Sequence, residues 1–210
     1  MISETIHRRG VMAALAACGL FPPVTANAAG VSRNAEAEAF VQVEGQKALA
    51  VVTNRALGPA ARDEAFRRII DQLADLQRIS GFVLGKYARV ITPAQRQRFN
   101  AVFKGYAQRL FQTNLAGFRG NKLTVVGSVV RAPGDTVVNT TITGDPNSGP
   151  LPVAWRVLGQ SGSFKAVDVQ ARGVWLAITL QQDFVSTIDN AGGNINVLLA
   201  RLEADASPGR

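Results

Sequence analysis

The sequence is poor in the residues that most enzymes use for covalent or metal-assisted chemistry. It has one histidine, His7, and one cysteine, Cys18, and both precede residue 29 of the 210-residue chain. The remainder therefore lacks the usual pairs of nucleophile and base and the commonest transition-metal ligands. We expect no catalytic chemistry of these kinds and no cofactor.

Long apolar runs are also missing, although 47% of the residues are hydrophobic. No run reaches the ~18 residues that a membrane span needs, whereas the apolar content is sufficient for a substantial core. A chain of this length forms one domain, or at most two small ones. The sequence therefore predicts one core in a protein that is soluble or peripherally attached to a membrane.

The first 28 residues have the three regions of an export signal in the expected order. His7, Arg8 and Arg9 form a basic start, and residues 11–21 form a short apolar stretch that ends at two prolines. Ala26-Asn27-Ala28 then matches the small-x-small pattern that a signal peptidase cleaves. We expect residues 1–28 to be a cleaved signal peptide and residues 29–210 to be one mature domain. Whether export uses the general or the twin-arginine route stays open.

Cys18 offers an alternative to that cleavage. The run Leu15-Ala16-Ala17-Cys18 resembles a bacterial lipobox, in which the cysteine is lipidated and becomes the first residue. The apolar stretch before it is very short, and the second cleavage site follows. We therefore favour the unacylated product over a lipoprotein anchored through Cys18.

Acidic residues are absent from one long segment of this basic chain. The full sequence carries 23 Lys and Arg against 15 Asp and Glu, yet the segment from Lys86 to Lys122 has eight bases and no acid. Such a local field favours an anionic partner, which can be a phosphate head group, a membrane surface or an acidic protein. We expect no nucleic acid partner. The alternative is an ordinary solvated helix face.

The period of the apolar residues changes from 3.6 to 2 after Gly120. Thr92, Pro93 and Gln95 predict a helix start with a capping box. Helices first, then strands joined by short loops, then helices predict an α+β fold with helices packed on an antiparallel sheet of about four strands. The expected helices cover about 34–53, a segment from Pro59, about 93–115 and two segments after residue 183; the expected strands are 122–131, 136–143, 151–158 and 164–172.

Two groups of residues have more than one interpretation. The first is an aromatic stripe on the helix over 93–115, which faces either a filled core or a cavity closed by the valine-rich sheet; periodicity does not decide between them. The second is Asp168, which stands in an apolar strand segment next to the strand of Arg156. A catalytic acid needs a second titratable group, so we favour a structural ion pair between these two residues, with Arg172 placed to join it.

Several segments, in order along residues 60–202, resemble the MlaC or toluene-tolerance family. They are Phe82-Val83-Leu84-Gly85-Lys86-Tyr87, Thr92-Pro93-Ala94-Gln95-Arg96-Gln97-Arg98-Phe99, Val153-Ala154-Trp155-Arg156-Val157, Phe164-Lys165-Ala166-Val167-Asp168-Val169, Gly173-Val174, Asp183-Phe184 and Asn190-Ala191-Gly192-Gly193. The chain departs from the family's usual pattern at Arg172, where an acid is common, and at Gln181-Gln182.

The resemblance implies a function that composition alone does not show. Members of the family are periplasmic proteins that carry phospholipid between the outer and inner membranes for an ABC transport system. They dock on an MCE-domain subunit of the inner-membrane ABC transporter and on an outer-membrane lipoprotein complex. The implied fold is a curved, cone-like sheet similar to that of nuclear-transport-factor proteins. Acyl chains enter the apolar interior, and the head group stays at its mouth.

These inferences define the candidate site, which has no catalytic residue and no metal ligand. We expect the lipid to contact twelve apolar and aromatic residues, namely Phe82, Leu84, Tyr87, Phe99, Phe103, Tyr106, Val138, Ile142, Val153, Trp155, Val157 and Val169. We expect the head group or a docking partner to contact four bases, namely Lys86, Arg89, Arg96 and Arg98. The alternatives are a hopanoid carrier of a related branch, a carboxylate-dependent enzyme on a cone-like fold, and an adaptor with a filled core.

Overall fold

The computed structural model describes residues 32–115, 120–145 and 149–206, with the side chains of 111–115 and 206 left aside. Its contacts divide the chain into two units, Met1–Gly30 and Val31–Arg210, and the second unit is the one described below. The predicted signal peptide and Cys18 lie outside the described residues.

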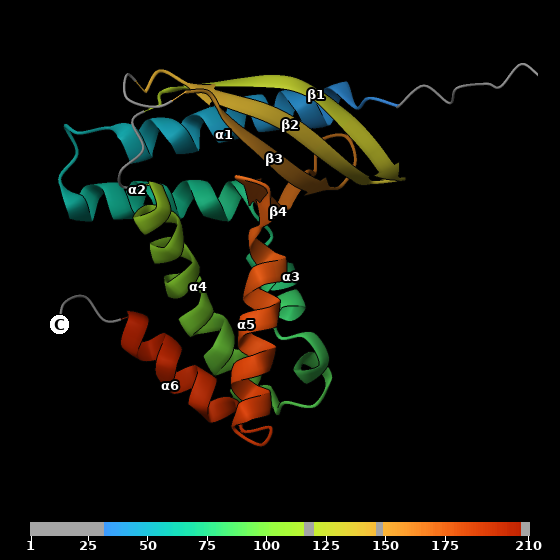
Figure 1. Cartoon of the computed structure of the whole chain (residues 1–210). Helices are drawn as coiled ribbons and strands as arrows, with labels where there is room; N and C mark the ends of the chain where they lie inside the picture. Colours follow the sequence, from blue (N-terminus) through green and yellow to red (C-terminus); the bar gives the residue numbers. More distant parts are fainter. Residues whose placement is uncertain (1–31, 116–119, 146–148, 207–210) are drawn as a thin grey trace, which may run out of the picture. The chain divides into compact units, whose positions relative to one another are not determined.

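The second unit begins with helix α1, Ala35–Thr53, which lies along one face of the sheet (Figure 1). The Asn34 side chain caps the helix by accepting a hydrogen bond from Ala37 N at 3.0 Å. The Asn34 backbone N–H in turn donates to Ser128 Oγ at 2.8 Å, which ties the cap to strand β1, Lys122–Ala132. Gly45 allows close packing at mid-helix, because a Cβ there would lie 3.0 Å from the end of the Leu123 side chain.

Three further helical segments lead to the long central helix. Helix α2, Pro59–Leu73, opens on a proline, whose fixed φ suits a first turn. Helix α3, Leu76–Val83, is capped by the Asp75 side chain and is followed by the 3₁₀ helix η1, Gly85–Arg89. Gly85 has a φ of +52°, and this left-handed residue turns the chain between the two.

Helix α4, Pro93–Leu115, starts where the sequence predicted. Thr92 N donates to Gln95 Oε1 at 2.9 Å, and Gln95 N donates to Thr92 Oγ1 at 3.2 Å. Each side chain therefore satisfies a backbone donor at the start of the helix, and the predicted capping box is confirmed.

The sheet of the described part is antiparallel and has five strands in sequential order. They are β1 Lys122–Ala132, β2 Asp135–Thr143, β3 Leu151–Leu158, β4 Lys165–Ala171 and β5 Val174–Trp175. The α+β class is confirmed, and the predicted set of strands is extended by one. Sequence reasoning missed β5 because two residues are too few to show a period of 2.

Two helices complete the fold. Helix α5, Leu176–Asn190, follows β5 directly, and helix α6, Ile195–Ala206, packs against α4 (Figure 1). Gly192 and Gly193 both have positive φ and make the turn between them. In the described part of the chain, no helix is both long and apolar enough to cross a membrane.

The buried side chains form two clusters rather than one continuous core. The sheet cluster joins α1 and α2 to the sheet and contains Ala37, Val41, Ala48, Leu49, Phe66, Ile70, Leu73, Leu123, Val138, Ile142, Val153, Trp155, Val157, Phe164 and Ala166. The helical cluster joins α3 to α6 and contains Val83, Leu84, Phe99, Phe103, Ala177, Phe184, Ile188, Ile195, Leu198, Leu199 and Leu202.

Candidate functional site

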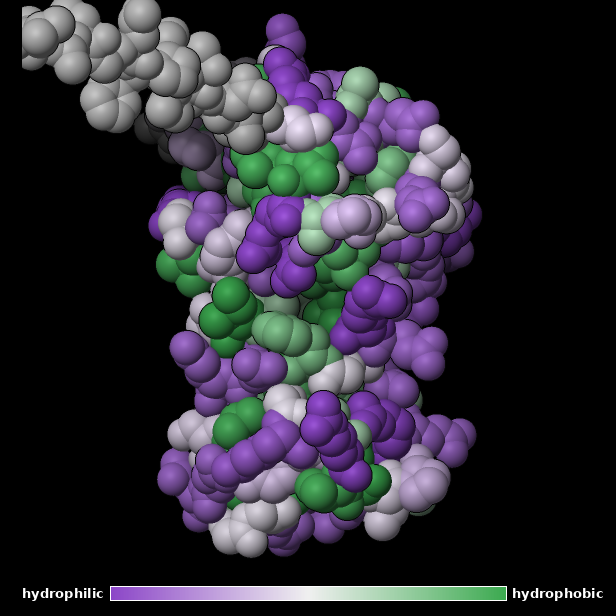
Figure 2. Space-filling model, turned by 90° about the vertical axis from the view of Figure 1, so that its right-hand side faces the viewer, coloured by the Kyte–Doolittle hydropathy of each residue, from purple (hydrophilic) through white to green (hydrophobic). Residues whose placement is uncertain are grey.

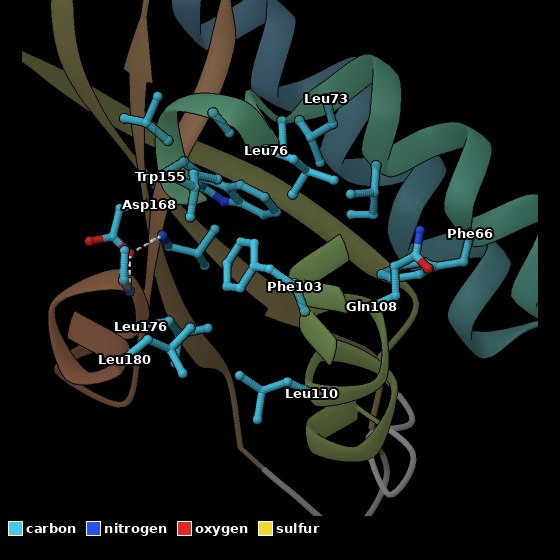
Figure 3. Close-up of a pocket in the computed structure, with 18 residues that line it drawn as sticks. Phe66, Leu73, Leu76, Phe103, Gln108, Leu110, Trp155, Asp168, Leu176 and Leu180 are labelled. Carbon is cyan, nitrogen blue, oxygen red and sulfur yellow. Dashed lines mark hydrogen bonds between the residues drawn. The ribbon is translucent and has the colours of Figure 1, made fainter. Parts of the chain in front are cut away.

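An apolar cavity lies where the sheet cluster meets the helical cluster. Strands β3 and β4 and helices α2 to α5 contribute its walls (Figure 3). Eighteen residues line it, namely Phe66, Ile70, Leu73, Ala74, Leu76, Ile79, Phe103, Ala107, Gln108, Leu110, Trp155, Ala166, Val167, Asp168, Val169, Leu176, Ala177 and Leu180. On the face shown in Figure 2, apolar surface lies in a recess between hydrophilic side chains.

Trp155 supplies the sheet-side wall and is held in place by a buried hydroxyl. Its indole Nε1 donates to Thr140 Oγ1 at 3.0 Å, and that hydroxyl donates to the Val153 carbonyl at 2.8 Å. Both side chains are almost completely buried. Because the polar edge of the ring is satisfied on the strand side, the apolar ring is free to line the cavity.

Phe103 supplies the facing wall from α4, and Figure 3 shows its ring beside that of Trp155. Phe103 stacks on Phe99, with ring centroids 5.4 Å apart, and meets Phe184 edge-on at 6.2 Å. Phe99 and Phe184 also meet edge-on at 6.0 Å. This three-ring group fixes the wall, since edge-on and offset contacts are the favoured arrangements of aromatic rings.

Helix α2 closes the cavity with Phe66, Ile70 and Leu73. In the sequence these three and Ile69 recur at helical spacing, which predicts a buried stripe on the helix that begins at Pro59. The spacing of four and three residues between Phe66, Ile70 and Leu73 places them on one helix face. The same three belong to the sheet cluster. The stripe was predictable, but its role in the cavity was not, because periodicity shows that a face is buried and not what it faces.

Two polar side chains lie at opposite ends of this lining, Asp168 at one and Gln108 at the other (Figure 3). Asp168 Oδ1 accepts hydrogen bonds from Val169 N at 2.8 Å and Ala177 N at 2.9 Å. Strand β4 therefore caps the start of α5, whose own N-cap residue, Trp175, makes no such bond. Burial raises the pKa of Asp168 above its ordinary value, and the two backbone hydrogen bonds and Arg156 oppose that rise.

The predicted ion pair between Arg156 and Asp168 is wrong, because Arg156 pairs with a different aspartate. The two are register partners on β3 and β4, as expected of the meander. The guanidinium instead pairs with Asp135, through contacts of 2.9 and 3.1 Å. Asp168 instead accepts a hydrogen bond from the backbone N–H of Ala177 in the first turn of α5. The alternation of residues along the strands gave no indication of this second donor. Arg172, with a φ of +52°, lies exposed in the β4–β5 turn.

The free interior of the cavity is about 80 Å³. An apolar cavity of about 150 Å³ in another protein holds one benzene molecule. Long acyl chains therefore require the walls to move apart.

The twelve predicted lipid-contact residues are distributed over both clusters. Phe103, Trp155 and Val169 line the cavity. Leu84 and Phe99 are buried in the helical cluster, with Tyr87 and Tyr106 packed against it. Val138, Ile142, Val153 and Val157 are buried in the sheet cluster. Phe82 is 41% exposed on α3. The structure thus brings three of them together at the cavity and places the others behind its walls or outside it.

The acid-free basic segment acquires acidic neighbours from elsewhere in the fold. Lys86 pairs with Asp189 of α5 at 2.7 Å, and Arg98 pairs with Glu203 of α6 at 2.7 Å. Arg96 donates to the Ala88 carbonyl, and Arg89 is exposed. Part of the positive charge of this segment, for which the sequence suggested an external anion, is therefore neutralised by acidic residues of the same chain.

Comparisons with known proteins agree with this architecture. A family model described as MlaC protein matches residues 44–204. The toluene tolerance protein Ttg2D of Pseudomonas putida is 24% identical over an alignment 214 residues long, which covers 97% of each chain. The solved structure of a phospholipid-binding protein from Ralstonia solanacearum, in complex with a phospholipid, matches with a TM-score of 0.68 and 26% identity. That match covers 81% of this chain and 97% of the other.

Proposed function

The chain belongs to the MlaC family, and from this membership we propose that it is a periplasmic carrier that shuttles phospholipid between membranes for an ABC transport system. The observation that carries the proposal is the apolar cavity between the two clusters. It is supported by the phospholipid complex of the Ralstonia solanacearum relative. Burial of each CH₂ contributes about 0.8 kcal/mol, so two long chains bind firmly without a specific polar contact.

The carboxylate-dependent enzyme has less support. Among the described residues that line the cavity, Asp168 alone is ionisable, and its Oδ1 already accepts two backbone hydrogen bonds. General acid–base chemistry needs a second titratable group within reach. We therefore assign Asp168 a structural role as the cap of α5.

The mature protein, in this proposal, begins at Ala29 after export and docks alternately on an MCE-domain subunit of the inner-membrane transporter and on an outer-membrane lipoprotein complex. The family resemblance supports both partners. The docking face we propose includes Lys86, Arg89, Arg96 and Arg98. Exposed ion pairs such as Arg98–Glu203 are weak and screened by salt, so an acidic partner can replace the internal one.

The carrier role is tested by mass spectrometry of organic extracts from the purified protein. The wild type should yield phospholipid. Ala107→Trp should yield much less, because the added ring fills the cavity from α4, while Ala101→Trp, on the exposed side of the same helix, should match the wild type. If extracts of the wild type contained no lipid, the proposal would be contradicted. If they contained a hopanoid and no phospholipid, the protein would be a hopanoid carrier instead.

The docking face is tested separately. Reversal of charge at Arg96 and Arg98 should weaken capture by the membrane transporter and leave the lipid content unchanged. A fall in retained lipid would instead place the head group at these residues, and no change in either quantity would leave them a solvated surface.

A further inference from the structure

Gln108 is an anomaly within the cavity. Its side chain is only 8% exposed, and its Nε2 has no hydrogen-bond partner among the residues that the structure describes. Figure 3 places it near Phe66, at the end of the cavity away from Asp168. A buried amide donor without a partner destabilises a fold, so most buried polar groups have one.

The two polar ends of the cavity differ in what they can offer a ligand. Asp168 is committed to backbone donors of β4 and α5, and it is an acceptor when charged. Gln108 retains a donor with no partner among the described residues, and apart from Asp168 the residues that line the cavity with it are apolar. A ligand that enters the cavity with a hydrogen-bond acceptor at the right depth would satisfy this donor, and a pure hydrocarbon would leave it unsatisfied.

We propose that Gln108 is a specificity-determining residue whose Nε2 donates a hydrogen bond to the carbonyl oxygen at the head of a bound acyl chain. In a diacyl phospholipid this oxygen belongs to an ester, at the boundary between the apolar chains and the polar head. This inference rests on the proposed function and adds to it the chemical feature that the cavity recognises. A polycyclic hydrocarbon lipid without a carbonyl is thereby disfavoured.

The assignment predicts opposite effects on stability and on binding when the amide is removed. Gln108→Met keeps the length of the side chain and removes the unsatisfied donor, so the lipid-free protein should melt higher, by roughly 2–4 °C. The same variant should bind a diacyl lipid about three- to tenfold more weakly. A side chain with a purely structural role would not produce opposite signs.

The test compares a diacyl phosphatidylglycerol with its dialkyl ether analogue of the same chain length, which lacks both carbonyls. The wild type should bind the ester lipid about three- to tenfold more tightly than the ether lipid. Gln108→Met should lose this preference, whereas Gln97→Met, at an exposed position of the same helix, should keep it. Free palmitate serves as a third ligand, because its carboxylate is the other source of an acyl carbonyl.

The outcomes separate this inference from the carrier role. Binding of neither phospholipid by the wild type would contradict the carrier role itself. Equal affinity for ester and ether lipids, or an ester preference that survives in Gln108→Met, would overturn the assignment of Gln108 while the carrier role stands. A Gln108-dependent gain seen with palmitate and not with the diester would overturn the ester assignment.

Discussion

The sheet cluster and the helical cluster are packed from different kinds of side chain. The sheet cluster combines β-branched residues with Trp155, and α1 packs closely on it at Gly45. The helical cluster is centred on the three rings of Phe99, Phe103 and Phe184. The buried side chains of each cluster pack mainly against one another. A cavity can therefore lie at the boundary without exposing either cluster to solvent.

Few polar contacts fasten one cluster to the other in the described part of the chain. Asp168 caps α5, Asp75 N donates to the Ala166 carbonyl at 3.0 Å, and Lys104 of α4 pairs with Asp71 of α2 at 2.7 Å. Hydrogen bonds and exposed ion pairs each contribute little net stability. In the carrier role proposed above, this boundary with few polar contacts is where the walls would separate to admit lipid.

The largest effect is expected from removing the central ring of the helical cluster. Phe184→Ala should destabilise the protein by about 3–5 kcal/mol in chemical denaturation, because it leaves a cavity among Phe99, Phe103 and Tyr106. Phe82→Ala is the matched control, since that ring is 41% exposed. Equal losses in the two variants would mean that the three rings are not the centre of their cluster.

A smaller effect is expected from the sheet cluster at Gly45. Gly45→Val should cost about 1–3 kcal/mol, because its side chain would enter space occupied by Leu123 and Trp155. Gly105→Val, also within a helix, meets only the flexible end of Arg109 at 3.7 Å and should be close to neutral. If the two valine variants unfold at the same denaturant concentration, α1 does not pack as closely on the sheet as described.

The hydrogen bond from α5 to Asp168, which connects the two clusters, can be examined through the pH dependence of stability. The pKa of Asp168 is raised above 3.8, mainly by desolvation. Between that value and the raised one, the folded chain binds more protons than the unfolded chain, so the contribution of this group to stability falls as pH rises. Asp168→Asn keeps an acceptor oxygen and does not titrate. Its stability relative to the wild type should therefore increase over that window, as measured by chemical denaturation at a series of pH values.

Asp189, on the surface of α5, should show a pH dependence of the opposite sign. Lys86 and then Tyr87 hold the pKa of this carboxyl below its ordinary value. Its contribution is therefore present above 3.8 and is lost as pH falls below it. Asp189→Asn should lose stability relative to the wild type as pH rises through this range. Identical pH profiles for the two asparagine variants would contradict at least one of the two assignments, and the direction of the profiles would show which.

Features of the fold that depend on residues close together in the sequence, or on adjacent strands, were predictable from the sequence, and features that depend on distant residues were not. The capping box at Thr92 and the meander register of Arg156 opposite Asp168 were predictable, because they depend on neighbours a few residues apart or on adjacent strands. The choice of Asp135 as the partner of Arg156 was not, because another strand and the start of α5 compete for the same charges.

The candidate site was less predictable than the fold. Periodicity marked Phe66, Ile70 and Leu73 as buried, and Phe103 as part of an aromatic face, yet gave no reason to place them around one cavity. Gln108 gave no sequence signal at all, since a glutamine within a helix is ordinary. Its significance depends on burial without a partner, which only the three-dimensional arrangement reveals.

The separation of the two clusters is tested most directly by tethering them. In the mature protein from Ala29, which has no cysteine of its own, cysteines at Asp71 and Lys104 would be joined by a short bis-maleimide across the boundary between α2 and α4. The control joins cysteines at Arg98 and Glu203, an equally close exposed pair that connects α4 and α6, two helices of the helical cluster. Lipid uptake from labelled vesicles should be blocked by the first tether and unaffected by the second. Equal uptake by both tethered proteins and the untethered ones would contradict the account, since the walls would then not need to part.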